Sequence, residues 1–227
     1  MSLVSYATTT LAQGRPDIFV TPIANLPFRG VVTVQRSDVQ RSGQIVNTHT
    51  QREIGRDSQG RIHNETRTLV PLSDHAMPAL LNIHLYDPAT RINTFIDPHR
   101  KTFTRVVINR PPATEPPNAY ASPSGNSMPL GQYAKEEDLG DSEIDGLQAH
   151  GVRITQTIPP ESSETGAEVV TTDEYWYSNE LRLNLVVKHH DPRTGSVEMT
   201  VSHVSRSEPD RALFEVPSEY RRVIPMR

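Results

Sequence analysis

The chain has 227 residues, a formal net charge of −4 and a hydrophobic content of 35%. It contains no cysteine, which excludes disulfides, thiolate catalysis and cysteine-ligated metals. Arginines such as Arg52, Arg56 and Arg61 alternate with acidic residues and form no basic stripe, so no nucleic-acid partner is expected. No apolar run of about 18 residues occurs, and the sequence therefore predicts no transmembrane segment.

Residues 1–26 show no helical periodicity and are expected to form an N-terminal tether, in which only Asp17 to Thr21 is a candidate strand. No charged segment leads into an apolar core, so no signal peptide is visible. Met1-Ser2-Leu3 is interpreted as an addition to a trimmed chain from which an export signal has been removed. The β domain is expected to begin at Pro27.

The first predicted strands form a long hairpin. β-rich runs cover Phe28 to Val34 and Gln44 to Ile54, and the second arm of the hairpin covers Arg61 to Val70. Asp57-Ser58-Gln59-Gly60 predicts the turn, because Gly adopts a positive φ without strain. The hairpin is polar on much of both faces, which predicts a position at a sheet edge or beyond the core.

A meander of three strands is predicted next. Leu81, Ile83 and Leu85 alternate with polar residues, the period of a half-buried strand. Ile92 to Ile96 and Phe103 to Ile108 complete the meander, and both turns begin with Asp-Pro. Proline removes a backbone donor and fixes φ, so these turns end each strand.

A proline-rich segment interrupts the pattern. Six prolines fall within residues 110–132, which are interpreted as a loop. This loop could divide two domains, but we favour a single β domain over residues 27–220, because too few strands flank it on either side for independent stability. The acidic residues from Glu136 to Glu143 are expected to lie in a polar loop, and residues 221–227 to form a C-terminal tail.

The second half again predicts strands, over Ile144 to Ile158 with breaks at Gly146 and Gly151, and over Val169 to Tyr177, Leu181 to Val187 and Val197 to His203. Asp210 to Phe214 is at most one helical turn. The fold class is therefore mainly β with little helix. We expect an antiparallel curved sheet, or an unclosed half-barrel, of about 10–11 strands.

Short motifs at turns and strand ends resemble a group of uncharacterised exported bacterial proteins over most of residues 50–220. The motifs are Arg56-Asp57-Ser58-Gln59-Gly60-Arg61, Asp138-Leu139-Gly140, Ile144-Asp145-Gly146, Gly151-Val152-Arg153, Glu174-Tyr175-Trp176-Tyr177-Ser178, Asp191-Pro192-Arg193-Thr194-Gly195 and the segment from Glu208 to Tyr220. More distantly, Trp176-Tyr177-Ser178 and the exit from Leu213 to Tyr220 are similar to the outer-membrane lipoprotein carrier superfamily. That resemblance implies an unclosed half-barrel around an apolar cavity and a periplasmic or secreted location.

Reactive side chains form no familiar site. His189-His190-Asp191 is the densest histidine cluster, but adjacent strand residues point to opposite faces and cannot bind one ion together. No nucleophile elbow, phosphate-binding glycine loop or zinc-protease helix occurs. We therefore assign no catalytic residue, cofactor or metal. Trp176 is interpreted either as an aromatic core anchor or as part of a binding surface.

Three functions are left open. An envelope protein that binds a lipid or another apolar ligand would hold a cavity of at least ~300 Å³. An interaction or sensor module that contacts another envelope protein would instead show an exposed sheet edge or apolar patch near the polar hairpin. A hydrolase with an unfamiliar site would need converging acid and base groups. The candidate apolar cavity or surface residues are Leu81, Ile83, Leu85, Phe103, Trp176, Leu183 and Leu185.

Overall fold

The computed structural model describes residues 17–74, 76–108, 133–164 and 166–224. Strands make up 59% and helical turns 4% of the structure, and one sheet of 13 strands does not close into a barrel. All pairings are antiparallel except that of β13 with β7. The predicted fold class, a mainly β antiparallel curved sheet with little helix, is confirmed. The predicted loop at residues 110–132 and most of the predicted tether lie outside the described residues.

The strands follow one another in two runs, before and after residue 109. The first run comprises β1 (Phe28–Val39), β2 (Ile45–Arg56), β3 (Ile62–Arg67), β4 (Val70–Pro71), β5 (Leu80–Asp87), β6 (Ile92–Asp97) and β7 (Thr102–Val107). The second comprises β8 (Ala134–Ile144), β9 (Leu147–Ile158), η2 (Pro160–Ser162), β10 (Val169–Ser178), β11 (Leu183–Asp191), β12 (Gly195–Ser205), η3 (Arg211–Phe214) and β13 (Arg221–Arg222).

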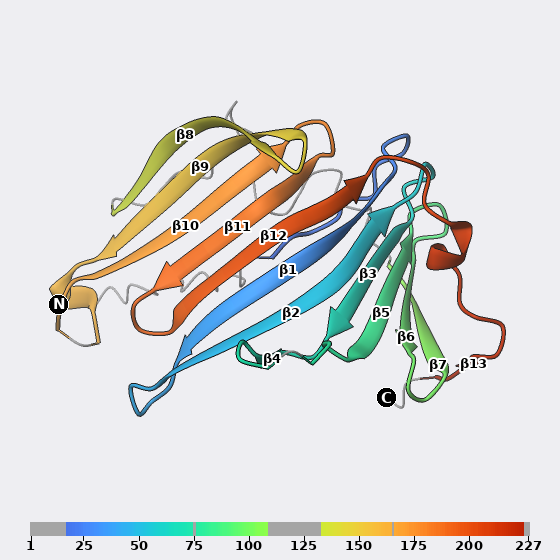
Figure 1. The fold of residues 1–227 in the computed structure, drawn as a ribbon, viewed down its shortest axis with the longest axis horizontal. Coiled ribbons are helices and arrows are strands. Elements are labelled where there is room, and N and C mark those ends of the chain that lie inside the picture. Colours follow the sequence, from blue (N-terminus) through green and yellow to red (C-terminus); the bar gives the residue numbers. More distant parts are fainter. Residues whose placement is uncertain (1–16, 75, 109–132, 165, 225–227) are drawn as a thin grey trace, which may run out of the picture.

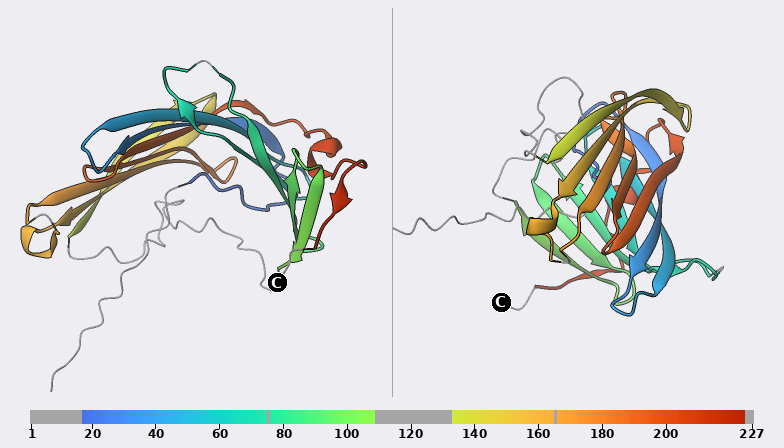
Figure 2. Two further views of the ribbon diagram at one scale, coloured as in Figure 1. Left: turned by 90° about the horizontal axis from the view of Figure 1, so that it is seen from below. Right: turned by 90° about the vertical axis from the view of Figure 1, so that its left-hand side faces the viewer.

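The two runs meet in the middle of the sheet (Figure 1). The strand order is β13-β7-β6-β5-β3-β2-β1-β12-β11-β10-β9-β8, and β4 pairs with β2 beside this path. β1 pairs with β12, so strands from both sides of residue 109 share one continuous sheet. Figure 2 shows that this sheet is arched, with a concave and a convex side.

Apolar residues line up across the concave side. Val34, Met199, Val187, Tyr175 and Val152 are successive cross-strand partners on β1, β12, β11, β10 and β9. Directly paired residues project to the same face of a sheet, so these five side chains form one row. Each is at most 8% exposed. We call this set the inner row.

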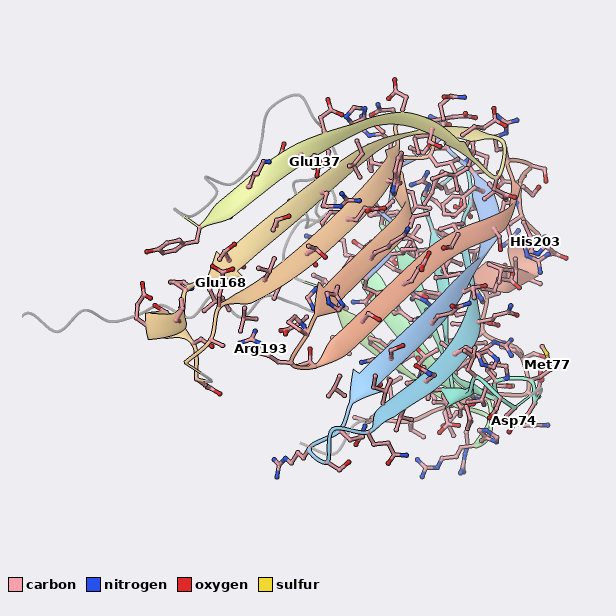
Figure 3. The ribbon with its side chains drawn as sticks, turned by 60° about the vertical axis from the view of Figure 1, so that its left-hand side comes forward. Asp74, Met77, Glu137, Glu168, Arg193 and His203 are labelled. Carbon is pink, nitrogen blue, oxygen red and sulfur yellow. The ribbon has the colours of Figure 1, made fainter. Side chains whose placement is uncertain are left out.

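Charged residues line up on the opposite face, one position along. Glu198, Lys188, Glu174, Arg153 and Glu137 are successive partners from β12 to β8, and their charges alternate. Arg153 lies 2.9 Å from Glu174 and 3.3 Å from Glu137. Glu137, on β8, is the last residue of this row (Figure 3). Period-two alternation along each strand therefore separates an apolar concave face from a charged convex face in this half of the sheet.

The acidic residues 136–143 were expected in a loop, and this was wrong, because they form part of β8. The strand expected over Ile144 to Ile158 is broken at Gly146, as predicted, but continues through Gly151 as β9. Asp145 and Gly146 have φ values of 51° and 74°, the left-handed pair that a tight hairpin turn requires. Of the two positions expected for the polar hairpin, the sheet edge was wrong, because β2 and β3 lie between β1 and β5. Its charged residues are accommodated by cross-strand ion pairs such as Arg29–Glu53.

One buried cluster forms the core. It contains the inner row together with residues such as Phe28, Val32, Ile54 and Val201. Ile18, near the end of the predicted tether, is 0% exposed within the same cluster. Residues 17–27 contain no strand, so the candidate strand over Asp17 to Thr21 was wrong. In the described part of the chain, no helix is long and apolar enough to cross a membrane.

Candidate functional site on the concave face

The segment formed by residues 17–27, which we call the inner segment, runs under the arch of the sheet (Figure 2). Because it forms no strand, its contacts with the sheet are made by side chains and by carbonyl groups that accept from arginines. Ile18 is buried in the core, and Val20 packs against the same cluster. The inner segment therefore covers apolar surface of the concave face without adding to the sheet.

Arg52 fastens the beginning of the inner segment. On β2 it lies opposite Val32, so its side chain shares the concave face with the core. Its guanidinium forms an ion pair with the carboxylate of Asp17, donates to the carbonyl of Ile18 at 3.3 Å, and donates to Asn64 Oδ1 at 2.8 Å. The side chain is only 12% exposed, so the ion pair is partly shielded from water.

Arg56 fastens the rest of the inner segment. It is 0% exposed and donates at 2.8 Å to three backbone carbonyls, those of Leu26, Thr21 and Leu181. Its guanidinium also lies 5.1 Å from the centre of the Phe28 ring. Burial lowers the pKa of Arg56 to about 10. No carboxylate among the described residues forms an ion pair with it, so backbone carbonyls and the Phe28 ring, rather than a counter-ion, stabilise this buried cation.

The apolar surface of the concave face begins directly beside Arg52. Val32 is paired with Arg52 on one side and with Val201 on the other. Val34 in the inner row is two residues from Val32 and points to the same face. An apolar group that lay along the inner row could therefore place a polar end at Arg52.

The concave face becomes polar toward the turn between β11 and β12. Asp173 and His189 are paired across β10 and β11, two residues from the inner row, and His189 Nδ1 lies 2.7 Å from Asp173 Oδ1. Asp191 accepts hydrogen bonds from Arg193, and these bonds lower the pKa of Asp191. No cluster of three or more metal-ligating side chains occurs among the residues that the structure describes.

The structure divides the seven predicted apolar site residues between two faces. Leu183 and Leu185 are 1% and 0% exposed and belong to the cluster that contains Ile18. Trp176 packs at the margin of this cluster, over Gly151, and its Nε1 donates to Glu174 of the charged row. The tyrosines on either side of it are buried on the opposite face.

The other four predicted residues belong to the end of the sheet formed by β5, β6 and β7. Leu85 is paired with His63, whose ring contacts Leu213 and Phe214 of η3 on the convex side. Ile83 and Phe103 are both cross-strand partners of Ile96, so these three side chains form a separate row. Leu81 is 45% exposed. The structure therefore does not bring these four residues together with Leu183 and Leu185.

Sequence reasoning did not single out Asp17, Ile18, Arg52 or Arg56. A signal for Arg52 was present, because it lies two residues before Ile54 in a predicted strand and must share a face with that apolar residue, whereas Arg56 lies two residues beyond the predicted end of the strand. The signal for the inner segment was the short apolar run from Ile18 to Val20.

No family model matches the chain, and no curated protein matches it. Solved structures that match include MucB at 10% identity with a TM-score of 0.41, over 88% of this chain and 60% of that one. LprF from Mycobacterium bovis matches at 14% identity and a TM-score of 0.36, over 86% and 90%. A LolA superfamily protein from Nitrosomonas europaea matches at 10% identity and a TM-score of 0.33, over 85% and 91%.

The chain thus spans about 60% of the length of MucB. A member of the lipoprotein carrier superfamily, which the C-terminal motifs resemble, is among the matching structures. At identities of 10% to 14%, these likenesses concern the fold alone.

Proposed function

We propose that this protein is an envelope protein, periplasmic or secreted, that binds an apolar chain on the concave face of its sheet. One observation carries the proposal: the inner row crosses five adjacent strands on the face that the inner segment covers. Ile18 and Val20 of the inner segment pack against the core cluster there. Ligand would bind as the first part of the inner segment, residues 17–20, moves aside, while Arg56 holds Thr21 and Leu26 in place.

The energies of burial favour such an exchange. Full burial of one aliphatic side chain contributes about 1.5–3 kcal/mol, so the fully buried Ile18 and the partly buried Val20 together contribute less than about 6 kcal/mol. An acyl chain of about 12 methylenes gains roughly 10 kcal/mol at about 0.8 kcal/mol each. The inner segment makes no strand pairing that would have to break. In apolar burial alone, a long acyl chain therefore gains more than the side chains that it displaces, and the contacts of Arg52 with Asp17 and the Ile18 carbonyl must be replaced as well.

The test is a titration with N-phenyl-1-naphthylamine, an apolar dye whose fluorescence rises on burial. We expect saturable binding, competed by added n-dodecanol. Val187→Thr places a hydroxyl in the inner row and should weaken dye binding about tenfold, because a polar group on the binding surface must lose its water. Val186→Thr is the matched control, since Val186 lies next to Val187 on the same strand and points to the opposite face.

Thermal unfolding of both variants checks that each is folded at the titration temperature. A dye signal that does not saturate in the wild-type protein would overturn the proposal. An equal loss of binding in both variants would overturn the assignment to the concave face.

A second function, docking of a protein partner, is favoured by exposed apolar side chains near β4. Ile45, Leu72 and Met77 are 60%, 51% and 78% exposed, and Met77 projects from the loop between β4 and β5 (Figure 3). A photo-crosslinking amino acid at position 77 would form one discrete adduct in the producing cell if a partner docks there. A smear or no adduct, as expected at the control position Ile224, which is 86% exposed, would reject this function.

A further inference from the structure

The inner segment presents two chemically different groups side by side. The carboxylate of Asp17 forms an ion pair with Arg52, and the alkyl side chain of Ile18 lies fully buried in the core. The backbone carbonyl of Ile18 also accepts from Arg52. Asp17 and Ile18 together therefore occupy the concave face in the manner of a small amphiphile, with an anionic head at Arg52 and an apolar tail among the core residues.

The positive charges of Arg52 and Arg56 have no other carboxylate beside them among the described residues when Asp17 is displaced. Arg52 and Arg56 are two residues from Ile54 on either side and share its face. Asp17 is the one carboxylate that pairs with Arg52 in the described ranges, and none pairs with Arg56. The other partners of Arg52, Asn64 Oδ1 and the Ile18 carbonyl, are neutral.

Glu53 and Glu65, which are close in sequence, do not correct this imbalance. Glu53 forms its ion pair with Arg29, and Glu65 with Arg67, on the opposite face of β2 and β3. A ligand that displaced Asp17 and covered Arg52 without supplying an anion would leave this guanidinium, which is 12% exposed beneath the inner segment, without a counter-charge. A partly buried charge left without a partner is strongly unfavourable.

We propose that the ligand is an anionic amphiphile, whose head group takes the place of the Asp17 carboxylate at Arg52 and whose alkyl chain takes the place of Ile18. The inference rests on the proposed function and names the ligand class for the same site. A carboxylate and a phosphate ester share the required chemistry, since both offer oxygen acceptors that a guanidinium binds in a bidentate manner. A neutral amphiphile of equal length would fill the apolar surface and leave Arg52 unpaired.

The experiment compares dodecanoate, dodecyl phosphate and n-dodecanol, each below its micelle concentration, by displacement of the apolar dye at pH 8. We expect the wild-type protein to bind at least one of the anions about tenfold more tightly than dodecanol. The ratio of dodecanoate to dodecyl phosphate shows which head group is preferred.

Two variants assign the selectivity to the Arg52–Asp17 pair. Arg52→Gln should reduce the preference for anions over dodecanol to about one, because the counter-charge is gone. Asp17→Asn removes the internal competitor and should tighten binding of the preferred anion more than that of dodecanol. Arg29→Gln is the matched control, since it also removes a guanidinium from an ion pair with a carboxylate, but on the opposite face.

Each outcome decides a separate point. If no amphiphile displaces the dye, the proposed function itself fails. If dodecanol and both anions bind equally and Asp17→Asn changes none of their ratios, apolar binding stands and the anionic ligand class is overturned. Asp17 is 38% exposed at its side chain and carries no core packing, so this arm decides the question even if Arg52→Gln fails to fold.

Discussion

At the scale of single residues, Arg56 shows how one side chain ties distant parts of this protein together. Its three hydrogen bonds reach the inner segment at Thr21, the entry to β1 at Leu26, and the turn between β10 and β11 at Leu181. A hydrogen bond to a charged group contributes about 1.5–3 kcal/mol. The Thr21 carbonyl also accepts from the backbone N–H of Ile23 at 3.0 Å. A planar guanidinium with five donors in fixed directions suits three separate acceptors.

We predict that Arg56→Lys lowers the free energy of unfolding by about 3 kcal/mol or more, because an ammonium cannot reach three diverging carbonyls. Urea denaturation at pH 7 measures the loss. Arg211→Lys, at an arginine whose side chain is 80% exposed, is the control and should change the stability by less than about 0.5 kcal/mol. Equal stabilities of the two variants would show that Arg56 is not the anchor described above.

At the scale of elements, the turns decide how the strands are arranged. Asp87, Asp97 and Asp191 each accept a backbone hydrogen bond inside the turn that follows a strand, as their position before proline predicts. β8 illustrates the opposite case. Its acidic residues look like a solvated loop, yet the chain pairs them with β9 and leaves them at the sheet edge, where repeated charge discourages pairing with another chain.

Two glycines in turns should respond differently to substitution by alanine. Gly146 has a φ of 74° and open space around it, so Gly146→Ala should cost only the left-handed conformation, about 1–2 kcal/mol. Gly195 has a φ of 116°, and a Cβ there would collide with the Ser37 carbonyl of β1, so Gly195→Ala should cost more than about 3 kcal/mol. Urea denaturation of both variants tests the order, and a smaller loss for Gly195→Ala would contradict it.

At the scale of the whole molecule, the sheet is continuous because the first strand and the last long strand are neighbours. Val32 is paired with Val201 and Val34 with Met199, so the core is built from both ends of the chain. The long hairpin, for which a sheet edge was one of two expected positions, lies in the interior of the sheet because β1 pairs with β12. The concave face exists only because these two runs of strands are joined.

We therefore predict that both runs unfold together as a single domain. Trp176 is the only tryptophan and reports on the second run, whereas far-ultraviolet circular dichroism reports on all strands. Ile54→Ala, in the first run, should destabilise the fold by about 2–5 kcal/mol and shift both transitions equally. A Trp176 fluorescence transition that stays at its wild-type midpoint would show that the second run is an independent domain.

The local alternation of apolar and polar residues was enough to predict the fold class, most strands and the Asp-Pro turns, because period two and turn chemistry act over a few residues. Other features depended on contacts between residues far apart in the chain. Alternation shows that the side chains of Leu85 and Val187 are buried. It does not show that they lie on opposite faces of the sheet, Leu85 on the side of η3 and Val187 on the side of the inner segment. The roles of Arg52 and Arg56 were hidden for the same reason: a charged residue in a strand is normally solvated, and only the passage of residues 17–27 beneath the sheet buries these two.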